Sequence, residues 1–573
     1  MKTPKAFVRL LFIAIVFISF QCSQQQKADL IILDAEIYTM DTLLPSVQAM
    51  AIKDGKILAM GTDEEIMKWA GSETEVEKLN GQFIIPGLIE GHAHFSYLGK
   101  SLLDLNFMNV TSWDEAVRMV EEAAKKLPEG TWIEGRGWHQ EKWQTIPQEN
   151  VNGYPFHDAL SAVTPNHPVI LRHASGHSLF ANKKAMDLAG IQAETPSPSG
   201  GVIVRSSDGE AIGVFEERAM SLISDPFNQY LETLDEDALQ EKWLMGIKLA
   251  QEECLSHGIT SFQDAGSSFE EVEQYRKMAE ASDLKVRLYA MVRHASDVLA
   301  KELDKLPIID AGNGYFTCRA IKSELDGALG VFGAWKLKPY ADKPGYTGQN
   351  TTSIEELKKI ADLAVKHKMQ LCVHAIGDKA NREFLNICDS LFKINPEGNT
   401  WRWRSEHAQH LDTADIKRFA PLGIFASMQG IHCTSDAPFV VKRLGQERSR
   451  TGAYAWRSLL DAGVIINNGT DAPVESIDPI ECFYASVTRK RKDSGKAFFP
   501  EQSMTRHEAL YSYTMANALA AFEEKNKGSL SVGKYADFVI LSNNLITCTE
   551  AEILKTEVLR TYVGGKLAYQ KAN

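Results

Sequence analysis

Short apolar runs alternate with amphipathic helical stretches between residues 87 and 520, and this alternation constrains the fold more than any other feature. The runs expected to form buried strands are 169–171, 258–262, 286–292, 370–373, 423–428 and 464–467. The helices expected between them include 113–127, 239–257, 353–367 and 456–462. Strands that alternate with helices form parallel βαβ units, and a (β/α)8 barrel is the commonest arrangement of so many units. The sequence therefore predicts an α/β protein with a TIM-like barrel.

The two chain ends have a different pattern, in which short strand-like runs are separated by tight turns. Asp54-Gly55 and Asn80-Gly81 are typical hairpin turn pairs. The strand-like runs at the two ends are 30–38, 48–52, 56–60, 75–79, 536–541, 558–563 and 566–569. We therefore predict one small β-sandwich domain that combines residues 27–86 with 521–573. The barrel domain would then occupy residues 87–520, with 100–230 as an insertion near the barrel mouth.

Composition and charge exclude several classes of function. The chain has 573 residues and a formal net charge of −13, and its one basic run, 489–492, is short and isolated. A nucleic-acid-binding protein normally carries a basic surface, so we expect no nucleic-acid partner. The eight cysteines are widely spread with no C-x-x-C pair, which argues against a zinc ribbon or a disulfide scaffold.

The N-terminus has the pattern of an export signal. Lys2, Lys5 and Arg9 precede the apolar run 10–20, which is too short to cross a bilayer and ends just before Cys22. This arrangement resembles a bacterial lipoprotein signal, in which the cysteine is lipidated and becomes the first mature residue. We therefore expect residues 1–22 to be a signal peptide and the protein to lie in the bacterial cell envelope, facing the periplasm. Its membrane contact would be the lipid on Cys22 alone. An ordinary secretory signal or an uncleaved anchor is the alternative.

Four histidines and one aspartate follow the expected strands. His92 and His94 come after the apolar run 83–91, and residues two apart on an extended chain point to the same face, so both can reach one metal ion. His374, His407 and Asp471 each follow another strand-like run. Singly, each histidine could be a core residue and the aspartate a helix N-cap. Together, at the strand ends where barrel enzymes place functional groups, they indicate a metal centre.

Such a set is suited to hydrolysis. Neutral imidazoles and a carboxylate suit zinc or a similar divalent ion, which lowers the pKa of bound water from about 15.7 to about 7. A carboxylate that touches this water can take its proton and return it to the leaving group. Asp471 is the expected residue for this catalytic role.

The order of these residues on a predicted barrel with β-strands at both chain ends resembles the amidohydrolase superfamily. Within it, the chain is similar to the branch of the N-substituted formamide deformylases and the YtcJ-like hydrolases. The similarity covers nearly the whole mature chain, in segments that include GRGW at 135–138, LRHASGHSLFAN at 171–182, HAIGDKAN at 374–381, EHAQ at 406–409 and SMQ at 427–429.

The resemblance implies a second metal ion and one further ligand. In IKSELDG at 321–327, Lys322 occupies the position of a lysine that is carboxylated in the superfamily and then bridges two metals. Carboxylation matters because an unmodified ammonium would repel a metal ion. By the resemblance, one ion would be held by His92, His94 and Asp471, the second by His374 and His407, with Lys322 between them. The alternative is a single ion, with Lys322 in a salt bridge.

His177, His432 and Trp138 match further family positions and are expected to line the substrate pocket. Either histidine could donate a hydrogen bond to a carbonyl oxygen or a developing oxyanion. Alternatively, each histidine could contact the residues around the site without touching the substrate, or could pack within a loop. Trp138 could instead be a core residue.

The sequence thus predicts a metal-dependent hydrolase that cleaves a carbon–nitrogen bond in a small, non-peptide amide, with metal-bound hydroxide as the nucleophile. An N-substituted formamide or a cyclic amide would fit. The family's Ser-Arg pair is replaced by Val331-Phe332, so no relative's substrate is carried over. The same centre acting on an ester, a lactone or a carbamate is one alternative, and a tethered lipoprotein that binds a ligand without turnover is another. The oligomeric state stays open, with a homodimer as one option.

Overall fold

The computed structural model describes residues 26–145 and 147–572. The expected signal peptide and Cys22 therefore lie outside the described residues. Within the described ranges, no helix is both long and apolar enough to cross a membrane.

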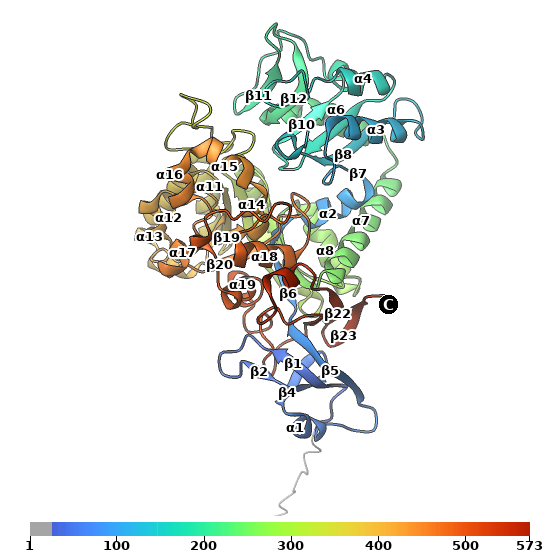
Figure 1. Cartoon of the computed structure of the whole chain (residues 1–573), viewed down its shortest axis with the longest axis vertical. Helices are drawn as coiled ribbons and strands as arrows, with labels where there is room; N and C mark the ends of the chain where they lie inside the picture. Colours follow the sequence, from blue (N-terminus) through green and yellow to red (C-terminus); the bar gives the residue numbers. More distant parts are fainter. Residues whose placement is uncertain (1–25, 146, 573) are drawn as a thin grey trace, which may run out of the picture.

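Eight parallel strands form the barrel at the centre of the chain (Figure 1). In order around the barrel they are β6 (Leu88–Ala93), β13 (Ile259–Ser267), β14 (Arg287–Val292), β16 (Phe316–Glu324), β17 (Gln370–Ala375), β18 (Arg404–His407), β19 (Phe425–Gln429) and β20 (Ile466–Gly469). The last strand returns to the first, because the Asp471 amide donates to the His92 carbonyl at 2.8 Å and the His94 amide donates to the Ala472 carbonyl at 2.8 Å. The predicted TIM-like barrel is confirmed.

Helices surround this barrel and follow from amphipathic sequence and capping. In α11 (Ile354–Lys366), the Ser353 hydroxyl accepts a bond from the Glu356 amide, and the buried face consists of leucine, isoleucine and alanine. The other barrel helices are α2 (Phe95–Leu103), α7 (Glu236–Ser256), α8 (Phe269–Glu280), α9 (Ser296–Glu302), α10 (Ala311–Gly314), α12 (Asp378–Ile394), α13 (Thr413–Phe419), α14 (Gly430–Ser435), α15 (Ala437–Leu444), α16 (Gln446–Gly452), α17 (Trp456–Asp461), α18 (Pro479–Thr488), α19 (Arg506–Ser512) and α20 (Met515–Ala520). A short strand, β15 (Ile308–Asp310), pairs with β16.

Strands from both chain ends form one sheet at the far end of the barrel from the insertion (Figure 1). Its members are β1 (Leu30–Tyr38), β2 (Ser46–Val47), β3 (Ala49–Lys53), β4 (Lys56–Gly61), β5 (Glu75–Pro86), β21 (Phe538–Leu541), β22 (Val558–Val563) and β23 (Lys566–Gln570), with α1 (Asp63–Met67) beside them. The short helix α21 (Glu550–Ile553) packs against α18 of the barrel. β5 joins the two ends, since it pairs with β1 on one side and β21 on the other. The sheet is continuously hydrogen bonded and encloses a core that includes Ile32, Ile84 and Phe538.

Residues 105–231 form a separate αβ unit that stands over the barrel mouth (Figure 1). Its sheet has the order β11 (Gly201–Arg205), β12 (Ala211–Glu217), β10 (Ser178–Ala181), β9 (Val169–His173), β8 (Ile133–Trp138) and β7 (Leu105–Asn106). The helices α3 (Trp113–Ala124), α4 (Asp158–Val163), α5 (Lys183–Leu188) and α6 (Ser221–Leu231) belong to it. Run 169–171, which we expected among the barrel strands, lies in this sheet instead. Both faces of β9 are covered, with Leu171 and Ile170 in different apolar clusters, and this double burial gives it the composition of a barrel strand.

Candidate metal centre and substrate pocket

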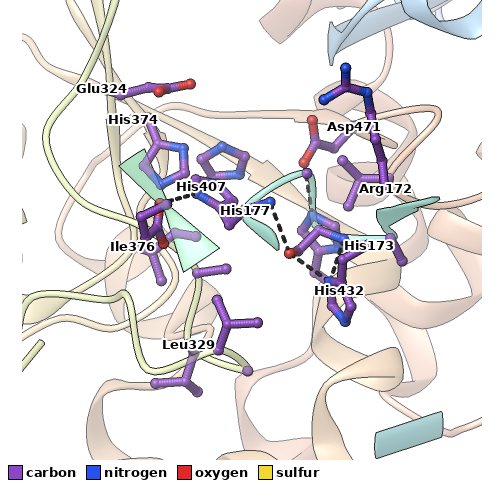
Figure 2. Close-up of a pocket in the computed structure, with 18 of the residues that line it drawn as sticks. Arg172, His173, His177, Glu324, Leu329, His374, Ile376, His407, His432 and Asp471 are labelled. Carbon is purple, nitrogen blue, oxygen red and sulfur yellow. Dashed lines mark hydrogen bonds and ion pairs between the residues drawn. The ribbon is translucent and has the colours of Figure 1, made fainter. Parts of the chain in front are cut away.

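The polar residues predicted from the sequence gather at the carboxyl ends of the barrel strands. A cavity of about 490 Å³ lies there between the barrel and the insertion, and Figure 2 shows the residues that line it. Seven of the predicted residues line the wall: His94, Lys322, His374, His407, Asp471, His177 and His432. His92 does not line it and is fully buried beside the group. Parallel barrel strands place their carboxyl ends on one face, which explains why residues far apart in the sequence meet there.

His92, His407 and Asp471 form the most compact group. One potential ligand atom from each lies within 4.8 Å of the other two. His92 Nε2 is 3.5 Å and His94 Nε2 is 3.2 Å from Asp471 Oδ1, and the rings of His92 and His407 are 4.6 Å apart. Imidazole nitrogens and a carboxylate oxygen at these separations can converge on one divalent ion.

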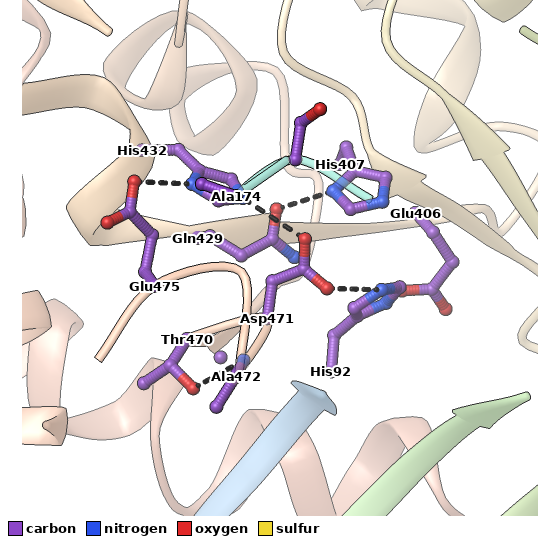
Figure 3. Close-up of polar contacts among 12 residues, drawn as sticks. His92, Ala174, Glu406, His407, Gln429, His432, Thr470, Asp471, Ala472 and Glu475 are labelled. Atoms are coloured by element: carbon purple, nitrogen blue, oxygen red, sulfur yellow. Dashed lines mark hydrogen bonds and ion pairs between the residues drawn. The ribbon is translucent and has the colours of Figure 1, made fainter. Parts of the chain in front are cut away.

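Two buried side chains fix how the imidazoles point (Figure 3). The Nδ1–H of His92 donates to Glu406 Oε2, and the Nδ1–H of His407 donates to Gln429 Oε1 at 2.8 Å. With Nδ1 engaged in this way, the Nε2 lone pair of each ring is left for a metal ion. Burial lowers the pKa of His92 and holds that of His407 well below its usual value, which keeps both rings in the neutral form that binds metal.

Buried ligand atoms without hydrogen-bond partners indicate whether His92, His407 and Asp471 could bind a cation. Within residues 26–145 and 147–572, neither His92 Nε2 nor Asp471 Oδ1 has a hydrogen-bond partner, although both are buried. Leaving a buried polar atom unpaired costs about 1–3 kcal/mol, more when the group is charged. A divalent ion would satisfy both atoms, so the donor set fits a metal.

Asp471 is held at the point where the last barrel strand meets the first. Burial alone would raise the pKa of its carboxyl, but the neighbouring His432 and His94 imidazoles outweigh burial and hold that pKa well below its usual range. Beneath it, Glu90 accepts bonds from the Thr470 amide at 2.8 Å and from the His92 amide at 3.1 Å. Glu90 thereby ties the two ligand-bearing strands together.

His374 lies across the pocket from Asp471 (Figure 2), and Lys322 also lines the cavity. The His374 and His407 rings are 4.4 Å apart. The Lys322 side chain is 1% exposed, burial lowers its pKa, and no carboxylate of the described residues lies within ion-pair distance of it. The salt bridge considered as the alternative is therefore not formed within the described residues, and a buried lysine without a carboxylate partner fits carboxylation.

The two predicted pocket histidines are each held by a glutamate. His177 comes from the insertion, and its Nδ1 lies 3.0 Å from Glu217 Oε2. His432 Nε2 lies 3.3 Å from Asp471 Oδ2, and its Nδ1 lies 3.6 Å from Glu475 Oε1. Burial alone would lower both histidine pKa values, but the neighbouring carboxylates raise that of His177 to about 9 and that of His432 to about 10.

Trp138 lies in the core of the insertion, not at the pocket wall. Its side chain is fully buried, and its Nε1–H donates to the Leu171 carbonyl at 2.8 Å. The pairing of β8 with β9 shifts register between Arg136 and Trp138, where Gly137 has a φ of 105°. This bulge turns the indole away from the cavity, which Arg136 lines.

The structure also adds residues that sequence reasoning did not assign. Glu406 lies next to His407 in the EHAQ segment, and Gln429 lies at the end of an expected strand in the SMQ segment. These positions were the only features of the sequence that could have indicated the two residues. Glu217, Arg136 and Arg172 reach the pocket from the insertion. Arg136 and Arg172 lie in the family-like GRGW and LRHASGHSLFAN segments, but neither segment indicates that these side chains reach the barrel mouth.

Comparison with known proteins gives one consistent family. The pattern of the amidohydrolase family matches residues 75–569. The chain is 31% identical to the amidohydrolase YtcJ of Bacillus subtilis, over 94% of this chain and 98% of that protein. It is 29% identical to the N-substituted formamide deformylase of Arthrobacter pascens, over 95% and 99% of the two chains, and 32% identical to Protein LONG AFTER FAR-RED 3 of Arabidopsis thaliana, over 95% and 92%. A crystal structure of an uncharacterized metal-dependent hydrolase from Pyrococcus horikoshii superposes with a TM-score of 0.71 at 25% identity, covering 91% of this chain and 99% of that one.

Proposed function

Because the chain belongs to the amidohydrolase family, we propose that it is a metal-dependent hydrolase that cleaves the carbon–nitrogen bond of a small, non-peptide amide. One observation carries the proposal: buried, unpaired ligand atoms of His92 and Asp471 face His407 at the carboxyl ends of the barrel strands. A relative named N-substituted formamide deformylase, aligned over nearly its whole length, supports an amide as the substrate.

The residues that would hold the metal are those expected from the sequence. His92, His94 and Asp471 would bind one ion and His374 and His407 a second, with a carboxylated Lys322 between them. Zinc suits this mixture of imidazole and carboxylate ligands. A bound divalent ion supplies a Lewis acid for the carbonyl and lowers the pKa of water at the site.

The remaining chemistry belongs to side chains of the pocket. The Asp471 carboxylate accepts the proton of the attacking water and delivers it to the departing nitrogen. His432 bonds to Asp471 Oδ2 on one side and faces Glu475 on the other, so it keeps that carboxylate oriented and ionised. His177, held by Glu217, faces the cavity beside His374 and is placed to donate a hydrogen bond to the substrate carbonyl oxygen. The insertion shields these groups from bulk water, which strengthens their electrostatic effect.

A panel of matched amides and esters, offered to the metal-loaded protein, tests this proposal. We expect amide hydrolysis in the wild type and a loss of about 10²- to 10⁴-fold in kcat for Asp471→Asn, the usual contribution of a general base. Asp415→Asn is the matched control, because Asp415 is buried on α13 and bonds to Arg382 at 2.8 Å, away from the pocket. A folded, metal-loaded Asp471→Asn protein as fast as wild type would contradict the proposal, as would recovery of every compound unchanged after long incubation.

We also propose that Cys22 carries a lipid and that the mature protein is anchored in the bacterial cell envelope, facing the periplasm. The supporting observation is a cysteine directly after a positively charged, apolar N-terminal segment. Metabolic labelling with a fatty acid should mark the wild-type protein and leave Cys22→Ala unlabelled. Labelling of both proteins, or of neither, would contradict lipidation at this residue.

A further inference from the structure

Two arginines of the insertion line the cavity next to the proposed metal centre. Arg136 on β8 and Arg172 on β9 are paired residues of adjacent parallel strands, and both belong to the pocket wall together with Asp471. In Figure 2, Arg172 and Asp471 lie on one side of the pocket, and Glu324 and His374 lie on the other. The insertion thus brings two positive charges to the substrate cavity.

Apart from Lys322, which the proposed metal centre uses, the other lysine and arginine residues of the cavity wall have partners within the described residues. Lys142 pairs with Glu475 at 3.0 Å, and Arg293 pairs with Glu324 at 2.7 Å. The exposed Arg218 donates from Nε to the Thr351 carbonyl at 3.1 Å. These charges are neutralised by the protein or face solvent, so they do not call for an anionic ligand.

Arg136 and Arg172 differ from these residues. Arg136 donates to two backbone carbonyls, those of Pro473 and Ala174, which fixes its guanidinium, and no carboxylate of the described residues forms an ion pair with it. The half-buried Arg172 guanidinium has neither a hydrogen bond nor a carboxylate within 4 Å among the residues that the structure describes. Two neighbouring positive charges repel each other, and a negative charge beside them would relieve that repulsion.

The N–H groups of the two arginines that are not already hydrogen bonded indicate which kind of anion the cavity could bind. An arginine fork presents parallel N–H groups that match the two oxygens of a carboxylate. Only Arg172 of the pair has its fork available, because both terminal nitrogens of Arg136 are already engaged. A single fork suits a planar group of one negative charge better than a phosphate, which carries more charge and more acceptor oxygens.

We propose that the substrate carries a carboxylate, bound by the fork of Arg172 beside the positive charge of Arg136. The substrate class is then an acidic amide, such as an N-acyl amino acid, with its scissile bond at the metal centre and its carboxylate against the insertion. This inference rests on the proposed function, because it specifies the substrate of the same site. It also gives the insertion a role, since β8 and β9 determine which amides are accepted.

Matched substrate pairs test the inference. Each pair is an N-formyl amino acid and the corresponding N-formyl amino alcohol, so the two compounds differ only where a carboxylate replaces a hydroxymethyl group. The readout is the ratio of the two kcat/KM values, measured with the metal-loaded protein. We expect wild type to prefer the acid and Arg172→Gln to lower the ratio by about 10- to 100-fold, the effect of losing a charge-assisted hydrogen-bonded pair. Arg172→Lys should fall between them, because it keeps the charge without the fork.

Arg218→Gln is the matched control, because it removes the same charge from the cavity wall at a residue that binds only a backbone carbonyl. Its ratio should equal that of wild type. A wild-type protein without a preference for the acid would overturn the inference, and so would a ratio that falls equally in Arg218→Gln and Arg172→Gln.

Titration calorimetry on the same compounds separates this inference from the proposed function. Tighter binding of the acid than of the alcohol, lost in Arg172→Gln, supports the carboxylate site even if neither compound is hydrolysed, an outcome that would count against the proposed function alone. Equal binding of acid and alcohol overturns the carboxylate site even if both are hydrolysed. Tighter binding of a matched phosphonate than of the carboxylate would also overturn it.

Discussion

Glu406 offers the sharpest test of how the protein orients its proposed metal ligands. Its carboxylate accepts the Nδ1–H of His92, and the side chains of the pair are 0% and 1% exposed, so water does not screen the interaction. A hydrogen bond to a charged group contributes about 1.5–3 kcal/mol and a neutral one about 0.5–1.5 kcal/mol. Glu406→Gln keeps an acceptor and loses the charge, a difference of about 1–1.5 kcal/mol, so metal affinity should fall by about 5- to 15-fold. Glu406→Ala loses the acceptor as well, and a fall of about 10- to 100-fold is expected.

Competition with a chromogenic chelator measures these affinities directly. Glu481→Gln is a suitable control, because Glu481 is a buried glutamate on α18 that pairs with Lys492 at 2.6 Å and touches no proposed ligand. Thermal unfolding of the metal-free proteins shows whether a variant has lost stability rather than affinity. A folded Glu406→Gln protein that binds metal as tightly as wild type would refute the claim that Glu406 orients His92 for the metal.

Three further predictions concern other parts of the molecule. Lys322→Met should reduce the metal content from about two ions per chain to about one, and an unchanged content would remove the bridging role of Lys322. Trp138→Ala should lower the free energy of unfolding in urea by about 3–5 kcal/mol through the cavity it creates in the insertion; a changed KM with unchanged stability would instead make Trp138 a substrate contact. Burial raises the pKa of Glu216 from 4.5 to about 7, so its contribution to stability is complete below about pH 4.5 and is lost as the pH rises through about 7. The full shift corresponds to up to about 3 kcal/mol. Glu216→Gln should therefore remove this pH dependence from urea unfolding curves, and an unaltered dependence would contradict the assignment.

The barrel could be predicted from the sequence because its strands and helices have distinct periods and lengths. Run 169–171 shows the limit of this argument: β9 is buried on both faces in the insertion, as a barrel strand is, so composition alone does not distinguish the two locations. The tight turn at Asp54-Gly55 was recognisable, since both residues have positive φ angles, 50° and 76°, and this residue pair favours them.

The histidines proposed to bind metal had a local signature, whereas the residues that orient them did not. His92 and His94 share an extended segment, but Glu406 lies 314 residues from its partner His92. Lys322 was identified only through the family resemblance, because one lysine in a strand has no chemical pattern of its own. Arg172 lines the same cavity as the proposed metal ligands only because the insertion folds back over the barrel, a long-range arrangement that no local pattern encodes. Trp138 was expected at the pocket, and the bulge at Gly137 that turns it inward depends on strand pairing rather than on sequence spacing.

The most direct test of the central claim is the metal content of the full chain, measured by elemental analysis after purification without chelator and with bicarbonate present. We expect close to two divalent ions per chain, held by the histidines, Asp471 and a carboxylated Lys322. A chain that binds no divalent ion, even after reloading, would contradict the proposed metal-dependent hydrolase.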